Sequence, residues 1–287
     1  MPSIITNLGE IANHGFEMSL SARIVSSSKF NWTTDFYFDT NDNEIKELIG
    51  LDRDGDGKED DLVASNLFIG ESIGTIYEYE IDRIWQIADW QNGTIPVEKV
   101  GLYKYVDQNE DGLITPTDRT ILGRHEPAYS FGIQNSLSYK NFKLNFFIKS
   151  IQGGKNGYLL LNEPDHRDGS TFLGGDNWFV EADKWTPFNT DAQFQKQYGI
   201  PTLSGSETQG HYLARNFVRL QDISLSYTFD KGLTQRMGIE NLKVYVSGKD
   251  LLTITKWPGW DPETGQGTGE GGYPVMKGVS VGLNFEF

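Results

Sequence analysis

Twelve residues near the middle of the chain, DQNEDGLITPTD, have the spacing of a calcium-binding loop. The candidate ligands are the oxygen-bearing residues at positions 1, 3, 5, 7 and 12 of the loop, namely Asp107, Asn109, Asp111, Leu113 (through its carbonyl) and Asp118. A glycine occupies position 6, where such loops turn sharply. An Asp at position 12 in place of a bidentate Glu predicts weak binding. A hydrogen-bonded acidic turn without calcium explains the same residues.

A second acidic run, DRDGDGKEDD, offers the carboxylates of Asp52, Asp54, Asp56 and Asp60. Its position 12 is Val63, which has no side-chain oxygen to complete a calcium site. For this run we favour a solvated acidic loop over a metal site.

Other catalytic or cofactor motifs are weak or missing. The four histidines lack HExxH spacing, no GxSxG elbow is present, and the acidic surface explains the many carboxylates better than a glycosidase pair does. The stretch GTGEGG (267–272) matches a dinucleotide-binding pattern but precedes no predicted helix, which indicates a flexible loop. We therefore predict that the chain is not an enzyme and has no organic cofactor.

Four tryptophans fall in predicted loops, where they have two interpretations. Indole rings could stack on sugar faces, or they could serve as loop packing and interface anchors, which we favour for any single ring. The four are Trp178, Trp185, Trp257 and Trp260.

Composition excludes several classes of partner. The net charge of -15 argues against nucleic acid and against anionic lipid surfaces, because both require Lys and Arg. The chain has no cysteine, so disulfides and thiolate metal sites are excluded. No apolar run is long enough for a transmembrane helix. The first residues, MPSIITNLGE, lack the basic and apolar regions of a signal peptide, so we expect none in this chain.

Apolar and polar residues alternate with a period of two along most of the chain, and helical periodicity is almost absent. The last stretch, KGVSVGLNFEF, is the clearest example, with Val279, Val281, Leu283, Phe285 and Phe287 all on one side. Comparable alternation predicts seven long antiparallel strands, near residues 16–24, 30–38, 129–139, 142–148, 214–229, 242–254 and 279–287.

The connections between these strands distinguish a soluble sandwich from a transmembrane barrel. Short connections near 26–28 and 140–141 alternate with long ones near 43–127, 153–212 and 256–276, and one of middle length lies near 230–241. Short periplasmic turns and long extracellular loops are typical of a transmembrane β-barrel. We therefore predict that the long connections are extracellular and that GTIYEYEIDRIWQ belongs to an extracellular hairpin.

Charged residues test which face of each strand meets lipid. Arg23, Asp35 and Lys149 all fall on the polar side of their strands, as expected for a hydrated lumen. Arg219 and Gln221 fall on the apolar side. Two explanations account for these positions. The start of the strand could stand beyond the hydrocarbon, or a β-bulge could shift the register, and we favour the first.

Seven strands cannot close a barrel, because two edges would expose unpaired backbone groups to lipid. Six stretches, in this order along the chain, carry a resemblance to a known family. They are NLGEIANHGFEMSLSARI, GESIGTIYEYEIDRIWQ, YVDQNEDGLITPTDRTILGRHEPAYSFGIQNSLSYKNFKLNFFIKSIQG, RNFVRLQDISLSYTF, VYVSGKDLLTITKWPGWDPETG and GVSVGLNFEF. They are similar to the C-terminal part of SusC/RagA-type TonB-linked outer-membrane transporters of Bacteroidetes. The resemblance covers nearly the whole chain.

The resemblance implies the last seven strands of a 22-stranded barrel plugged by an N-terminal domain. It implies import of oligosaccharides or peptides with a SusD-like lipoprotein, powered through the TonB complex. It also implies that the remaining strands, the plug and the signal peptide belong to a longer protein, of which this chain is a fragment or has a miscalled start. The terminal Phe287 resembles the signal read by the barrel-assembly machinery.

Three functions follow as hypotheses. The first is outer-membrane, TonB-dependent nutrient import, with an unknown choice between glycan and peptide. The second is a soluble calcium-dependent carbohydrate-binding β protein, which would fold without detergent. The third is an extracellular glycanase, which needs two positioned carboxylates. The rhythm of the loops, the alternation and the terminal Phe favour the first.

Overall fold

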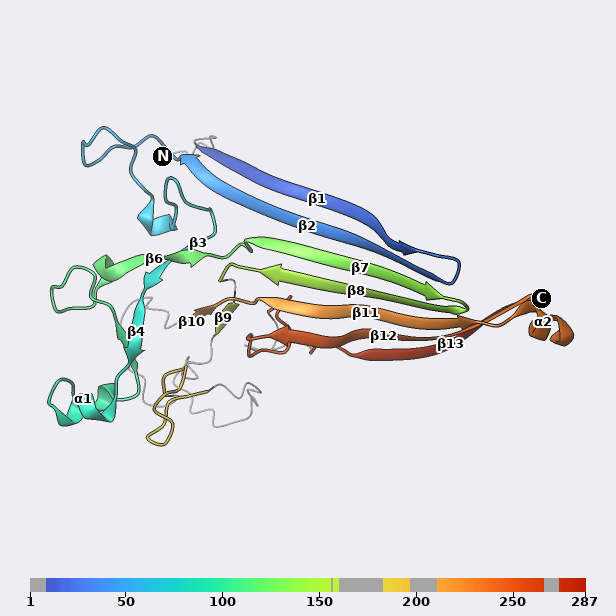
Figure 1. Ribbon diagram of the computed structural model, residues 1–287. Helices are drawn as coiled ribbons and strands as arrows, with labels where there is room; N and C mark the ends of the chain where they lie inside the picture. The colour runs from blue at the N-terminus through green and yellow to red at the C-terminus, as the bar shows by residue number, and fades with distance from the viewer. Residues whose placement is uncertain (1–8, 156, 160–182, 197–210, 266–273) are drawn as a thin grey trace, which may run out of the picture.

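The computed structural model describes residues 9–155, 157–159, 183–196, 211–265 and 274–287. Its main element is a seven-stranded antiparallel sheet with the order β1-β2-β7-β8-β11-β12-β13, so strands that follow one another in the sheet also follow one another along the chain (Figure 1). The strands are β1 (Glu10–Ser26), β2 (Phe30–Glu47), β7 (Tyr129–Tyr139), β8 (Phe142–Gln152), β11 (Phe217–Thr228), β12 (Asn241–Thr255) and β13 (Gly278–Glu286). The prediction of seven long antiparallel strands is confirmed. Within the described residues, no helix has the length and apolar character needed to cross a membrane.

The strand registers place the apolar residues in continuous rows on one side of the sheet. One such row runs through Leu20, Phe36, Ile133, Ile148 and Leu220, each directly opposite the next. The period of two then puts small and polar residues on the other side. We call the two sides the apolar face and the polar face.

Two buried polar side chains on the apolar face have hydrogen-bond partners. The side-chain oxygen of Asn135, which is buried, accepts a hydrogen bond of 2.9 Å from the indole N–H of Trp32 on the adjacent strand. The hydroxyl of Ser150 donates to the carbonyl oxygen of Phe217 at 2.8 Å. Both groups therefore avoid the cost of an unsatisfied buried polar atom.

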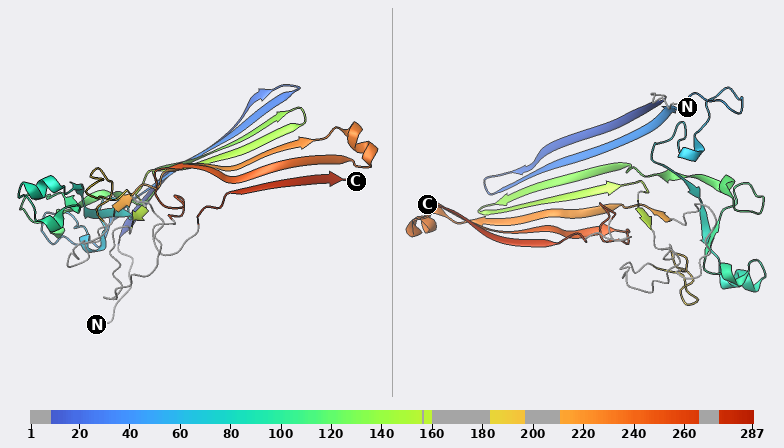
Figure 2. Two further views of the ribbon diagram at one scale, coloured as in Figure 1. Left: turned by 90° about the horizontal axis from the view of Figure 1, so that it is seen from below. Right: turned by 180° about the vertical axis from the view of Figure 1, so that it is seen from behind.

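The sheet is a single curved layer (Figure 2). Many side chains of its apolar face are exposed, including Phe16, Leu20, Leu225, Leu252 and Val281. Exposed apolar surface on this scale is unusual for a soluble monomer and indicates a contact with another apolar phase.

The position of Arg219 corrects one sequence prediction. Both neighbours of β11 show a register shift between Leu220 and Asp222, which leaves Gln221 as an extra residue. This β-bulge turns Arg219 to the polar face, where it lies opposite Lys149 and Thr253. The favoured explanation, that the strand start merely stands beyond the hydrocarbon, was wrong, and the register shift accounts for the break in alternation.

The connections separate to the two ends of the sheet (Figure 1). At one end, which we call the turn end, are the short turns after β1 and β7, the segment with helix α2 (Lys231–Thr234), and the C-terminus. The long connections after β2, β8 and β12 lie at the other, which we call the loop end. The first long connection begins after Glu47 and not near residue 43, because β2 stays paired with β1 as far as Glu47.

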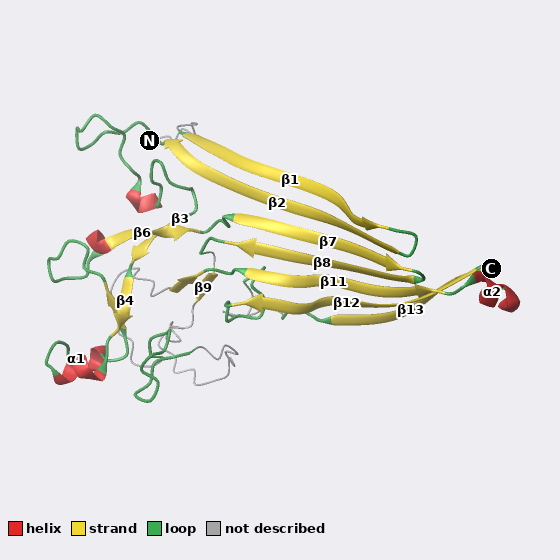
Figure 3. Cartoon of the chain, viewed as in Figure 1, coloured by secondary structure: helices red, strands yellow, loops and turns green. Residues whose placement is uncertain are grey.

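Short strands at the loop end pair outside the main sheet (Figure 3). The stretch GTIYEYEIDRIWQ forms two of them, β3 (Thr75–Tyr79) and β4 (Ile81–Ile84). β3 pairs with β6 (Arg119–Arg124), and β4 pairs with β5 (Tyr103–Tyr105). Helix α1 (Ile87–Gln91) follows β4, and a further pair consists of β9 (Gly157–Leu159) and β10 (His211–Leu213).

These loop-end segments have a hydrophobic core of their own. Residues 183–196, from the second long connection, pack against residues 81–105 from the first. The core consists of Ile84, Ile95, Val100, Tyr103, Trp185 and Ala192. We call residues 75–124 together with 183–196 the loop unit.

Candidate functional site

The predicted calcium loop lies in the loop unit, between β5 and β6, and its carboxylates bind the backbone of the loop itself. The two oxygens of Asp107 accept hydrogen bonds from the N–H groups of Asp111 and Gly112, the latter at 2.7 Å. The side-chain oxygen of Asn109 accepts from Asp111 at 3.0 Å, and Asp111 accepts from the N–H of Leu113 at 2.8 Å. These hydrogen bonds close the turn.

Asp118, the proposed position-12 ligand, is fully buried and has a structural partner for each oxygen. One oxygen accepts from the N–H of Gln108 at 2.9 Å, and the other accepts from the N–H of Thr115 at 2.7 Å. The bond from Thr115 is the main cause that lowers the pKa of Asp118. This carboxylate caps the 3-10 turn Pro116–Asp118 and does not present two free oxygens to an ion.

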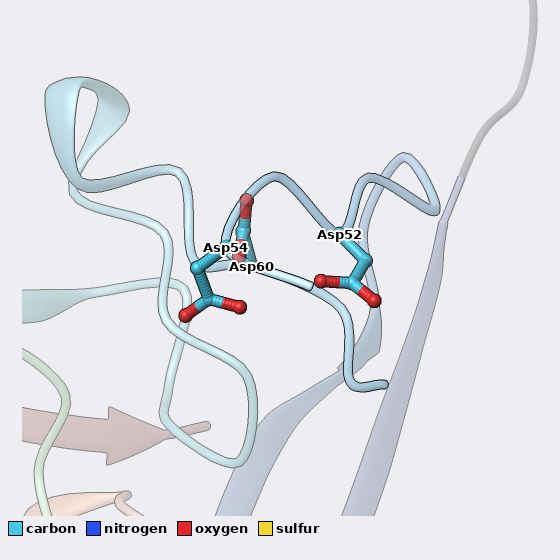
Figure 4. Close-up of side chains that lie close together, drawn as sticks. All are labelled: Asp52, Asp54 and Asp60. Carbon is cyan, nitrogen blue, oxygen red and sulfur yellow. The ribbon is translucent and has the colours of Figure 1, made fainter. Parts of the chain in front are cut away.

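The second acidic run brings three carboxylates together. Oxygens of Asp52, Asp54 and Asp60 lie within 4.8 Å of one another, whereas Asp56 is not part of this group (Figure 4). Among the described residues, this is the only such group of three acidic, histidine or cysteine side chains. Asp52 accepts from the N–H groups of Gly55 and Gly57, and Asp60 accepts from Arg53. These hydrogen bonds organise the loop, as those of Asp107 and Asn109 do in the first acidic run.

A neighbouring carboxylate that the sequence did not single out anchors this loop to the end of β2. Glu59 accepts hydrogen bonds from the N–H groups of Gly50 and Leu48. These backbone donors, with Gly50 the largest contribution, lower the pKa of Glu59. Glutamate is common in loops, so only the folded geometry reveals this role.

Two of the predicted loop tryptophans serve in packing. Trp185 is 6% exposed and donates its indole N–H to the side-chain oxygen of Gln86 at 3.0 Å. Trp257 is 5% exposed. Neither ring offers an open face for a sugar, whereas Trp260 is partly exposed. Trp178 and the stretch GTGEGG lie outside the described residues.

Another tryptophan of the loop unit, Trp85, is flanked by cations. The guanidinium carbon of Arg83 lies 4.9 Å from the ring centre, and the ammonium nitrogen of Lys104 lies 5.5 Å from it. Arg83 also forms two hydrogen bonds with Asp89, at 2.7 and 2.8 Å. These bonds lower the pKa of Asp89 to about 2. The bonds of Asp89 to Arg83 and to the N–H of Gln86 stabilise the start of α1.

The polar face of the main sheet is hollowed over its middle strands. The hollow has a volume of about 440 Å³ and is open on one side. Its lining combines the apolar side chains of Phe146, Phe147 and Ile223 with polar and charged ones, namely Gln134, Asn145, Asp222, Ser224, Ser247, Lys249 and Ser280.

The chain is similar to known receptors over almost its entire length. It is 30% identical to TonB-dependent receptor P3 of Formosa agariphila over 309 aligned residues, which cover 99% of this chain and 30% of that protein. It is 25% identical to TonB-dependent receptor SusC of Bacteroides thetaiotaomicron, covering 98% of this chain and 27% of SusC. The chain thus spans about 30% of the length of the curated relatives it matches. No family model matches the chain.

Solved structures of the RagAB peptide transporter share the fold. One matches with a TM-score of 0.65 and 21% identity, covering 98% of this chain and 30% of the transporter chain. The 'closed-closed' state of the RagAB peptide importer matches with the same TM-score and 22% identity.

The seven-stranded antiparallel sheet therefore has the fold of a β-barrel fragment, as the sequence predicted. The named relatives are receptors and transporters and not enzymes, in agreement with the sequence. On these similarities the chain resembles a segment, somewhat less than one third in length, of the SusC-type TonB-dependent receptors.

Proposed function

We propose that this chain forms part of the wall of an outer-membrane receptor that imports a nutrient by a TonB-dependent mechanism. The observation that carries the proposal is the two-sided sheet. Its exposed apolar face suits contact with lipid, and its hollowed polar face suits a hydrated lumen. A soluble carbohydrate-binding protein would have to cover the apolar face, and the described residues leave much of it exposed.

The two edge strands require further strands. β1 and β13 each pair on one side only within the described residues. An open edge in lipid would leave a row of backbone N–H and C=O groups unsatisfied at several kcal/mol each. The proposal therefore includes closure by the remaining strands of the barrel, with a plug domain inside it.

The orientation in the membrane follows from the two ends of the sheet. The loop end carries the folded loop unit, and the turn end carries the short turns and the C-terminus. In our proposal the loop end faces outward and the turn end faces the periplasm. The final strand, with Phe285 and Phe287 exposed, would then present an apolar end to the barrel-assembly machinery.

The proposed partners are a SusD-like lipoprotein at the outer mouth and the TonB complex at the inner one. Support comes from the similarity to SusC and from the fold shared with a transporter described as RagAB. RagAB is a peptide transporter by its description. For the present chain we propose an oligosaccharide or a peptide as the substrate, since the polar lining suits either.

For the loop of Asp107 to Asp118, we propose the acidic-turn interpretation. Each oxygen of Asp118 accepts a hydrogen bond from a backbone N–H, which supports a structural role for this carboxylate in closing the turn. The turn is closed by its own hydrogen bonds. Calcium is therefore not a required component of the proposed function.

Outer-membrane fractionation and surface proteolysis of the full-length receptor test this function. An antibody against the loop unit should detect a heat-modifiable band in the outer membrane. Trypsin added to intact cells should cleave near the exposed Arg53 and Lys58, while the turn between β7 and β8, which also carries exposed lysine, should stay intact. Cleavage at that turn but not at residues 53–58 would reverse the orientation. A band in the soluble fraction would refute the membrane assignment.

Transport itself is tested by energy coupling. Uptake of a labelled oligosaccharide or peptide pool by cells that carry the receptor should stop when TonB is depleted. Uptake that persists without TonB would contradict the proposal.

A further inference from the structure

The β-bulge in β11 has a specific structural result at the loop end of the sheet. Because of the extra residue Gln221, the side chain of Arg219 lies on the polar face in one row with Gly132, Lys149 and Thr253. With regular alternation it would lie on the apolar face with Leu225. The bulge therefore moves a cation from the apolar side of the barrel wall to the polar side.

Arg219 has a complete set of partners on the polar face. It is 4% exposed. Its Nε donates to the hydroxyl of Thr253 at 3.0 Å, and its two terminal nitrogens donate to Glu263 at 2.8 Å and to Asp261 at 2.6 Å. The guanidinium carbon also lies 4.9 Å from the ring centre of Phe217. A buried arginine with three charged or polar partners holds its surroundings in one geometry.

Both acidic partners come from the segment that follows β12, residues 256–265, which we call the strap. Glu263 also receives the ammonium group of Lys149 from β8. Its carbonyl oxygen accepts from Arg215 at 3.3 Å. The strap is thus bound from β8 and from β11, two strands that precede it by many residues.

The strap is also folded internally around Asp261. This carboxylate accepts hydrogen bonds from the N–H groups of Glu263 and Thr264 and from the hydroxyl of Thr264. Burial raises the pKa of Asp261, but the hydrogen bonds from Arg219 and Thr264 outweigh it, and the net effect lowers the pKa. The carboxylate is therefore charged near neutral pH, as an ion pair with Arg219 requires.

The geometry fixes which side of the wall the strap covers. Lys149 of β8 and Arg219 of β11 belong to one row of the polar face, and the strap binds both side chains. At its start, the backbone N–H of Trp257 donates to the hydroxyl of Thr255, and the indole is buried. The strap therefore bends over the polar face and does not extend away from the wall.

We propose that Arg219 latches the strap across the polar face at the loop end, and that the latched strap narrows the outer mouth of the passage. The inference rests on the proposed function, because the polar face lines a passage only if the sheet is part of a barrel. It goes beyond that function by naming the segment that narrows the mouth and the side chain that holds it there.

The first test measures release of the strap in the full-length receptor. Arg219→Gln removes the charge, and Lys249→Gln is the matched control, since it removes an exposed cation from the same face. In Arg219→Gln, the backbone amides of the strap should exchange roughly tenfold faster or more, because the strap loses its charged hydrogen bonds to Arg219 in a buried site. The control should leave the exchange of the strap unchanged. Equal protection in Arg219→Gln and the native receptor would overturn the latch.

The second test measures the width of the mouth. The chain has no cysteine, so Lys249→Cys introduces a single thiol into it. This thiol lies on the polar face, and it is closer to the turn end of the sheet than the strap is. In intact cells, a large maleimide reagent should label this thiol several-fold faster when Arg219→Gln is added. A small maleimide should label it at a similar rate in both backgrounds. Equal labelling by the large reagent would show that the strap does not narrow the passage.

Two controls separate the latch from the proposed function. A heat-modifiable band must persist in each variant, and its absence in the native receptor would refute the barrel and not the latch. If Arg219→Gln fails to assemble, Glu263→Gln replaces it, since this partner is about one-third exposed and its loss is milder. Glu263→Gln should raise exchange in the strap in the same direction. Unchanged exchange in a folded Glu263→Gln receptor would overturn the proposal.

Discussion

Replacing Trp185 with alanine should detach residues 183–196 from the rest of the loop unit. The ring is 6% exposed and packs among Ile84, Ile95, Val100 and Tyr103. Large-to-small changes of a buried Trp cost about 3–5 kcal/mol. The indole hydrogen bond to Gln86 adds about 0.5–1.5 kcal/mol. Even the lower limit, about 3 kcal/mol, raises the open fraction of this segment by roughly 100-fold.

Limited proteolysis of the folded receptor measures this opening. The segment contains Lys184 and Lys196 as trypsin sites, and both should become sensitive in Trp185→Ala while the main sheet stays intact. Trp185→Phe keeps most of the packing and loses the hydrogen bond, so its cleavage rate should be intermediate. Trp90→Ala is the matched control, because Trp90 belongs to the same unit and is 45% exposed.

The reasoning fails if Trp185→Ala and Trp90→Ala are cleaved at the same rate as the native receptor. That result would mean that the core of the loop unit does not depend on the second long connection. Loss of the heat-modifiable band in Trp185→Ala would be a different result. It would show that the barrel needs the loop unit for assembly, whereas the separate hydrophobic core of the loop unit predicts that it does not.

Three further predictions concern the Asp89–Arg83 pair at α1, the bulge in β11 and the acidic turn that contains Asp118. Asp89 has a lowered pKa, so its stabilising contact with Arg83 should be constant down to about pH 4 and disappear as the pH falls towards 2. Hydrogen exchange of the α1 amides across this pH range measures the loss of the contact. In Asp89→Asn, the exchange of α1 should no longer show this loss. Deleting Gln221 should return Arg219 to the apolar face near the loop end, where a lipid-facing charge costs up to about 1 kcal/mol on top of its lost hydrogen bonds, and should reduce outer-membrane assembly more than Gln221→Ala does. Asp118→Asn should lower the thermal midpoint of the receptor, and millimolar calcium should not raise the midpoint of the native protein; a calcium-dependent rise would restore the calcium loop.

The acidic turn between β5 and β6 shows how far spacing alone can predict a site. The positions of Asp107, Asn109 and Asp111 indicated a tight turn, because short polar side chains bind nearby backbone groups. They did not show whether an ion or the backbone takes the oxygens. That choice depends on Asp118, whose two oxygens bind N–H groups of Gln108 and Thr115, and such bonds exist only once the turn has formed.

The strands and their faces could be derived from the sequence by itself, because alternation with a period of two is a local property. In β13, every second residue from Val279 to Phe285 is apolar, and no partner strand is needed to see this. The number of strands and the lengths of the connections follow from the same pattern. They were sufficient to predict an antiparallel barrel wall with long connections at one end.

Only the tertiary structure decided the register of β11 and the partners of its charges. A bulge is defined relative to the neighbouring strands, so Gln221 is an extra residue only in comparison with β8 and β12. The pair of Arg219 with Asp261, and the contact of Trp185 with the first long connection, join residues far apart in the chain. Such contacts depend on distances through space, which a local pattern of apolar and polar residues does not contain.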